Sequence, residues 1–157
     1  MEIILREQRN IDFAIDALRR VDLSKPHVVT VKEDKRTRSM RQHGLYFMWV
    51  TAIANHVGQS KDDLHMQFKG KFLLPMLLRD GHEETLQTNE AIKVIWQAGL
   101  KDQATTAKRF LVNHISTTWL KVDQFTELLN EVAEYARDGG IALPYPEDYH
   151  EIMGSKK

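Results

Sequence analysis

The sequence predicts an α+β fold that is mainly helical and carries a small β-sheet. Two short aliphatic runs, residues 2–6 and 27–31, have the composition of strands, and an amphipathic segment lies between them. Several later segments repeat apolar residues at three- and four-residue steps, the period of a helix with one buried face. Because two strands alone are marginal, we expect a third strand from elsewhere in the chain or from another subunit.

The composition is that of one ordinary globular domain, residues 1–157. A chain of this length buries roughly 70% of its unfolded surface. The 22 basic and 22 acidic residues cancel, which argues against a uniformly basic nucleic-acid coat but permits a local basic patch. The absence of cysteine excludes disulfides and thiolate zinc sites and indicates a reducing cytoplasm. No apolar run approaches the ~20 residues that span a bilayer, and the N-terminus does not resemble a signal peptide, so we expect a soluble cytoplasmic protein.

The N-terminal region reads as strand, helix, strand. Ile3, Ile4 and Leu5 form the first aliphatic run. Asn10 is placed to cap a helix, and Ser24-Lys25-Pro26 breaks the pattern that follows it. The apolar stripe of this helix is Ile11, Ala14, Ile15, Leu18 and Val21. Residues 27–31 are rich in β-branched side chains and give the second strand.

Residues 36–58 hold the most informative stretch, a basic loop that runs into a long helix. Ser39 and Gln42 have the spacing of a capping box, and Gly58 is the expected residue after the helix end. Residues 32–41 carry five positive and two negative charges. The expected buried face is Leu45, Met48, Trp49, Ala52, Ile53, His56 and Val57.

The second half of the chain is expected to be helical with polar connections. Ser60 and Asp63 cap a helix that Pro75 ends or kinks. Residues 79–106 read as a loop, a helix over about 90–97 and a second loop, while the spacing of residues 107–115 fits either a helix or a strand. A helix then runs to Gly139-Gly140, with an apolar face of Phe125, Leu128, Leu129, Val132 and Tyr135. The tail is expected to be extended, packed by Ile141, Leu143 and Tyr145, and frayed after about residue 152.

The basic loop and the start of the central helix have the residue types that bind single-stranded nucleic acid. Such binding needs cations for the phosphates and flat side chains on which bases stack. The loop supplies the cations, and the helix N-terminus adds backbone N–H groups suited to a phosphate. Gln42 and His43 are placed to contact the strand, and Phe47 offers a ring. The alternative is that the charges form a solvated loop and the aromatic residues belong to the core.

Enzymatic templates fit less well. Asp62, Asp63 and His65 could bind a metal in a nuclease, but the spacing of the histidines matches no compact zinc site. The two aspartates are also explained as acidic residues in the first turn of a helix. No glycine-rich phosphate loop or nucleophile elbow occurs, and without cysteine there is no cysteine nucleophile.

Three segments resemble the NinB family of phage recombination proteins, also called Orf. They are KPHVVTV, RSMRQHGLYF and ISTTWLKVDQFTELLNEVAEYARDGGIALP, within residues 25–75 and 115–145. Arg38, Ser39 and Gln42 match the family motif directly, whereas His43 stands where the family has Asn, and the motif's Leu and Trp are replaced by Tyr46 and Phe47. Residues 79–110 have no counterpart and look like an insertion.

The resemblance implies a NinB-like fold and a non-enzymatic homodimer without a cofactor, which binds single-stranded DNA and assists recombinase loading. Host single-strand-binding protein and a recombinase are the implied protein partners. The expected DNA-contacting residues are Lys35, Arg36, Arg38, Ser39, Arg41, Gln42, His43, Tyr46, Phe47, Lys69, Lys71, Lys108 and Arg109. A protein-interaction module and, less favoured, a metal-dependent nuclease are the alternatives.

Overall fold

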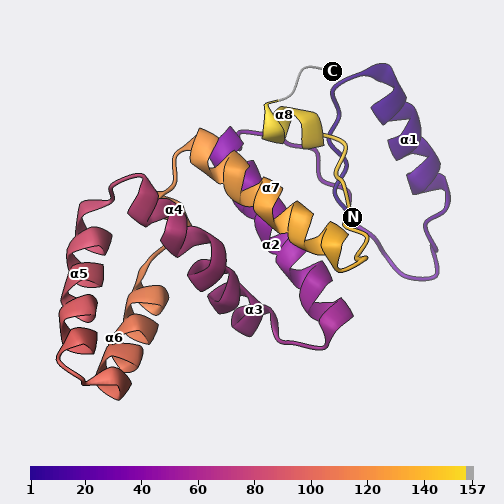
Figure 1. Cartoon of the computed structure of the whole chain (residues 1–157). Helices are drawn as coiled ribbons and strands as arrows, with labels where there is room; N and C mark the ends of the chain where they lie inside the picture. Colours follow the sequence, from indigo (N-terminus) through magenta and orange to yellow (C-terminus); the bar gives the residue numbers. More distant parts are fainter. Residues whose placement is uncertain (155–157) are drawn as a thin grey trace. The chain divides into compact units, whose positions relative to one another are not determined.

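The structure, a computed structural model, describes residues 1–154 and divides into two compact units, Met1–Arg36 and Thr37–Lys157. Described residues of both units form helices and loops (Figure 1). The elements in chain order are α1 (Gln8–Arg19), α2 (Arg38–Val57), α3 (Lys61–Phe68), the π-helix η1 (Lys69–Leu73), α4 (Leu74–Arg79), α5 (Glu83–Gln97), α6 (Lys101–His114), the 3₁₀ turn η2 (Thr117–Trp119), α7 (Val122–Asp138) and α8 (Tyr149–Met153).

The predicted α+β class is wrong, because residues 1–154 contain no strand. Residues 2–6 and 27–31 have the composition of strands, but neither pairs with a neighbouring strand in the described chain. Val28 and Val31 are 90% and 79% exposed. A strand requires a partner for its backbone groups, and β-branched composition by itself does not supply one.

The N-terminal unit contains α1 and two flanking extended segments. Asn10 does not cap α1 as predicted but is its third residue, and its Oδ1 accepts hydrogen bonds from the backbone N–H groups of Arg6 and Glu7. The apolar stripe of α1 is amphipathic as predicted but is not buried, since Ile15 and Leu18 are 42% and 48% exposed. This unit therefore has almost no core of its own.

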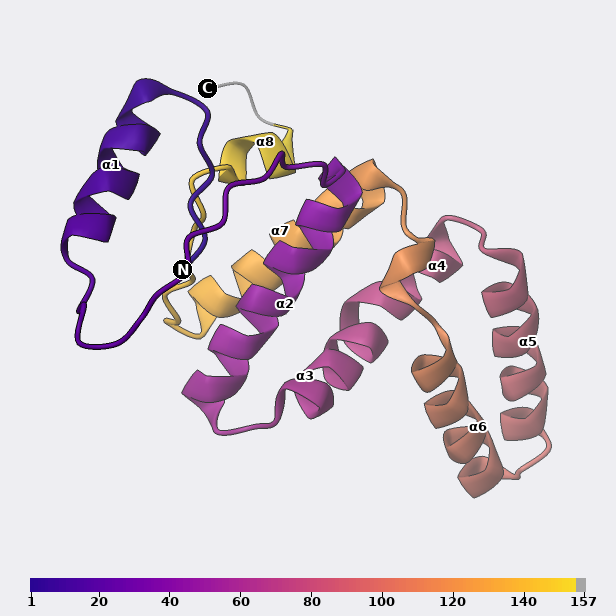
Figure 2. The same ribbon diagram turned by 180° about the vertical axis from the view of Figure 1, so that it is seen from behind.

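The second unit is built on the parallel pair α2 and α7, which lie side by side and run in the same direction in both views (Figures 1 and 2). The helix predicted over residues 39–58 is confirmed, and Gly58 ends it in the left-handed conformation with φ of 74°. Thr37, not Ser39, caps it, because the Thr37 hydroxyl accepts from the backbone N–H of Met40. The core between the helices includes Leu45, Trp49, Ile53, Phe125, Leu128, Leu129 and Val132.

The helix after Ser60 changes from α-helical to π-helical hydrogen bonding before Pro75. The Ser60 hydroxyl caps α3 by accepting from Asp63 N–H, as the cap pair predicted. In the η1 segment the N–H of Leu74 bonds to the carbonyl of Lys69, five residues back. Pro75 cannot donate a hydrogen bond, and its ring crowds the carbonyl four residues earlier, which explains why the helix widens here and continues as α4.

Residues 79–110 are more helical than the sequence indicated. They form α5, a short turn through Gly99, and most of α6. Residues 107–114 are therefore helix, and the polar loops expected before residue 90 and after residue 97 are wrong over 83–89 and 101–106, which are helical. The two helices make a hairpin that projects from α4 (Figure 1). The tail is extended over residues 141–146 but then forms α8, with Met153 buried. The remainder of the predicted fray, residues 155–157, lies outside the described residues.

Candidate nucleic-acid interface

The arginines at the start of α2 are engaged with the C-terminal segment of the chain. Arg38 donates from Nε to the carbonyl of Ile152 at 2.9 Å. Arg41 places its guanidinium 3.9 Å from the carboxylate of Asp148 and 3.5 Å from that of Glu151. Both arginines therefore have partners supplied by α8 and the turn before it.

Gln42, expected to contact DNA, is fully buried between α2, α7 and α8. Its amide nitrogen donates to Val122 O and Thr126 Oγ1, each at 3.0 Å, and to Ile152 O at 3.4 Å. All three partners are oxygens that accept here, which fixes the orientation of the amide. The Gln42 Oε1 atom is buried and has no hydrogen-bond partner in the described part of the chain.

His43 packs its ring on Phe125, with the ring centroids 4.4 Å apart. Its Nδ1 donates to the backbone carbonyl of Ser39 at 3.0 Å, because a carbonyl can only accept. The Nε2 atom is buried without a hydrogen-bond partner among residues 1–154. Ser39 itself is half-buried in the first turn of α2.

Tyr46 lies in the core rather than on a surface where a base could stack. Its ring is fully buried, and its hydroxyl lies 2.9 Å from His65 Nδ1. Burial raises the pKa of Tyr46, so the hydroxyl keeps its proton, and the tautomer of His65 sets the direction of this hydrogen bond. Phe47 is half-buried, and the Lys61 ammonium lies 5.1 Å from the centroid of its ring.

The remaining cations predicted to contact DNA fall into three environments. Lys35 and Arg36, in the N-terminal unit, form ion pairs with Glu33 at 3.8 Å and with Asp34 at 3.0 Å. Lys69 is only 7% exposed, and its Nζ donates to the carbonyl of Asn113 at 2.7 Å.

Lys71 lies on the surface of η1, with its Nζ 4.8 Å from the ring centroid of Tyr135. Lys108 and Arg109, on α6, are also exposed. The structure thus leaves Lys71, Lys108 and Arg109 on the surface of the second unit, whereas Lys69 is used internally.

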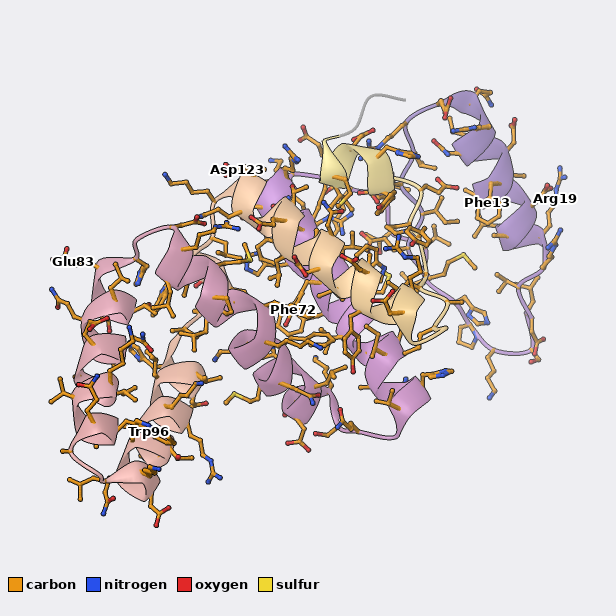
Figure 3. All side chains as sticks on the ribbon, viewed as in Figure 1. Phe13, Arg19, Phe72, Glu83, Trp96 and Asp123 are labelled. Atoms are coloured by element: carbon orange, nitrogen blue, oxygen red, sulfur yellow. The ribbon has the colours of Figure 1, made fainter. Side chains whose placement is uncertain are left out.

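The α5–α6 hairpin brings two exposed aromatic rings to the same element as Lys108 and Arg109. Trp96 is 50% exposed and Phe110 is 71% exposed, and the Nζ of Lys101 lies 5.2 Å from the Trp96 ring centroid. Figure 3 labels Trp96 on α5 near the turn between the two helices. The exposure of these rings could not be predicted from the sequence, because an apolar pattern does not show which aromatic residues of a helix remain without a packing partner.

The base of the hairpin is closed by ring contacts. Trp119 of η2 stacks on His82 at a centroid distance of 4.7 Å and an angle of 9°, and His114 meets its edge at 5.6 Å. His114 also lies 2.7 Å from the Glu84 carboxylate. These contacts join the first turn of α5 to the end of α6 and fix the direction in which the hairpin projects from the rest of its unit.

The possible metal site at Asp62, Asp63 and His65 is not assembled as a ligand cluster. The aspartates lie in the first turn of α3, and His65 bonds to Tyr46. Burial, followed by the charge on Lys69, lowers the pKa of His65. Within residues 1–154 no group of three or more His, Asp or Glu side chains is arranged to hold a metal ion.

Comparison of the chain with known protein families, with curated proteins and with solved structures found no match. Among residues 1–154, no helix combines the length and the apolar character needed to cross a membrane.

Proposed function

We propose that this protein is a non-enzymatic accessory factor of phage-type recombination that binds single-stranded DNA in the cytoplasm of a bacterial host cell. The resemblance of three segments to the NinB family supports the biological setting. It also supports host single-strand-binding protein and a recombinase as partners, with the protein assisting recombinase loading.

The observation that carries the DNA-binding proposal is the surface of the α5–α6 hairpin. Trp96 and Phe110 offer exposed rings, and Lys101, Lys108 and Arg109 are exposed cations on the same two helices. Rings for stacking and cations for phosphates are the two requirements for binding a single strand without sequence preference. The net charge of zero predicts modest affinity that falls steeply as salt rises.

The test is a fluorescence-anisotropy titration of labelled single-stranded and duplex oligonucleotides at low and moderate salt. The informative variant is Lys108→Ser/Arg109→Ser, which removes two adjacent exposed cations from α6. Arg19→Ser/Arg20→Ser is the matched control, because it removes two adjacent exposed cations, the last residue of α1 and its C-cap. We expect preferential single-strand binding by the wild type and the control, and a loss of about tenfold or more in the α6 variant.

A variant of an aromatic residue separates the contribution of base stacking from that of charge. Trp96→Ala leaves the net charge unchanged and should weaken single-strand binding by about 1–3 kcal/mol if a base stacks on the indole. The DNA proposal fails if the wild type does not bind at low salt. The hairpin assignment fails if the α6 and α1 double variants lose the same affinity.

The competing function is that of a protein-interaction module, and one observation favours it. Val94 and Leu100 are 64% and 50% exposed on the same hairpin, and exposed apolar patches mark protein interaction sites. Val94→Ser/Leu100→Ser should then abolish capture of a protein partner and leave DNA affinity unchanged. The opposite result, lost DNA affinity with unchanged partner capture, favours the DNA function.

We also propose that the protein is a homodimer, with contacts made by the N-terminal unit. Units below about 40 residues rarely fold alone without a disulfide, a metal or a partner. The chain has no cysteine, and Phe13, Ile15 and Leu18 on α1 are 54%, 42% and 48% exposed. Light scattering after gel filtration should give twice the monomer mass, and Ile15→Asp/Leu18→Asp should give the monomer. A monomeric wild type contradicts this proposal.

A further inference from the structure

The cations at the start of α2 already hold negative groups from the C-terminal end of the same chain. Arg41 lies between two carboxylates, at 3.9 Å from Asp148 and 3.5 Å from Glu151. Asp148 is 7% exposed, so its attraction to Arg41 is screened less by solvent than a surface pair would be. The Arg41 side chain keeps only 17% of its surface exposed.

The last helix adds a carbonyl oxygen to these carboxylates. Arg38 Nε donates to Ile152 O at 2.9 Å, and Gln42 Nε2 reaches the same oxygen at 3.4 Å. Residues 147–154, defined here as the acidic clasp, therefore present anionic and carbonyl oxygens to two arginines and a glutamine. Phosphate oxygens of a nucleic acid would make the same charge-assisted hydrogen bonds.

We propose that the acidic clasp is an intramolecular competitor of single-stranded DNA, which covers Arg41 and holds the exposed Arg38 side chain against the Ile152 carbonyl until α8 moves away. The inference rests on the proposed function. It adds a second cationic surface for DNA, at the start of α2, whose availability the clasp regulates. With the clasp in place, the Arg41 guanidinium is occupied by carboxylates and Arg38 Nε by a carbonyl, so neither group is free to bind a phosphate. When the clasp is displaced, the two arginines at the positive end of α2 become available to phosphates.

The clasp has the features of an element that can detach. A five-residue helix is too short to be stable by itself, so α8 depends on the burial of Ile152 and Met153. Near the start of α2, two buried polar atoms also lack hydrogen bonds within residues 1–154. Gln42 Oε1 and His43 Nε2 are buried polar atoms without a hydrogen-bond partner in the described chain, and such groups cost free energy while they stay buried.

Gly154 gives a way to open the clasp without changing charge. Its φ is 75°, which favours glycine, and a Cβ at this position would collide with the guanidinium of Arg38. Gly154→Ala therefore strains the end of α8 and pushes Arg38 away from the Ile152 carbonyl. Glu151→Gln opens it in a second way, because it removes one carboxylate from Arg41 and lies at a half-exposed position.

The experiment measures affinity for a labelled oligothymidylate across a salt series, for the wild type, Gly154→Ala, Glu151→Gln and Glu134→Gln. Glu134→Gln is the matched control, because it changes the net charge equally and removes the partner of another arginine, Arg137, at 3.7 Å. If the clasp masks the arginines about nine-tenths of the time, opening it raises affinity roughly tenfold. Two added phosphate contacts also steepen the salt dependence by about 1.4 in log–log slope.

Tighter binding and a steeper slope in both clasp variants, with the control close to the wild type, support the inference. Equal affinity of Glu151→Gln and Glu134→Gln, together with wild-type affinity of Gly154→Ala, overturns it and leaves the clasp a structural contact. If Gly154→Ala does not fold, the comparison of the two glutamine variants decides. Failure of the proposed function is distinct, since the wild type itself would then not bind.

Discussion

Replacing Gln42 distinguishes a DNA-contacting residue from a buried structural one. If Gln42 touched DNA at the surface, Gln42→Ala would weaken binding and leave stability unchanged. In the structure its amide joins three segments, through Val122 and Thr126 of α7 and Ile152 of α8. We therefore expect the free energy of unfolding to fall.

The size of the effect follows from the contacts. Two hydrogen bonds of 3.0 Å contribute about 1 kcal/mol each, and the cavity left by the side chain adds about 1 kcal/mol. Removal of the buried, unpartnered Oε1 stabilises the variant by about 1 kcal/mol and offsets part of this loss. Ile152 O keeps Arg38 as a donor, so no carbonyl is orphaned there. The expected loss is roughly 2 kcal/mol.

The assay is urea unfolding followed by far-ultraviolet circular dichroism. Ser39→Ala is the control, since Ser39 lies three residues earlier on α2 and its hydroxyl has no hydrogen bond to another described residue. The control should change stability by less than about 0.5 kcal/mol. Gln42→Glu should cost more than Gln42→Ala, because it turns a buried carboxylate toward three oxygens. Equal stability of Gln42→Ala and Ser39→Ala would refute the reasoning.

Three further measurements test local features of the fold. Gly58→Ala should lower the free energy of unfolding by about 1–2 kcal/mol in urea, because φ at this position is 74°. Gly44→Ala, at an equally open position inside α2, should raise it by about 0.5–1 kcal/mol. A change of the same sign in both variants would contradict this. The lowered pKa of His65 means that below about pH 6.5 the unfolded state takes up the proton first. Stability should therefore fall as pH decreases through that range, and His65→Gln should flatten the profile; an unchanged slope would exclude His65 as its source. Hydrogen bonds from Arg79 hold the pKa of Asp80 at about 2, so a carboxyl NMR titration of Arg79→Ala should show it rising toward 3.8, and an unmoved pKa would contradict the pairing.

The structure also shows why a triple replacement of Arg36, Arg38 and Arg41 is a poor test of DNA binding. Arg38 and Arg41 hold α8 through Ile152, Asp148 and Glu151. Their removal would alter the clasp and the affinity at once. The adjacent pair on α6 avoids this confusion, because Lys108 and Arg109 are exposed on a helix far along the chain from the clasp.

Helix ends and helix faces could be predicted from sequence because their signals are local. Gly58 ends α2, Ser60 caps α3, and the apolar spacing of residues 125–132 gives the buried face of α7. Each depends on residues within a turn or two of one another, where backbone geometry fixes which side chains meet. The candidate DNA-contacting residues were chosen from the same local signals, which do not show whether a side chain is exposed. Gln42, Tyr46 and Lys69 proved to be buried.

Only the tertiary structure shows which residues that are distant in sequence pair with one another. The aliphatic runs near residues 3 and 29 have strand composition, but a strand forms only against another strand. Gln42 reads as a surface group in a basic motif, yet it is fully buried, and its partners lie 80 to 110 residues away. The sequence by itself determined where the main helices form and stop, because those signals are short-range. Which polar residues became internal depended on long-range packing, which no local pattern encodes.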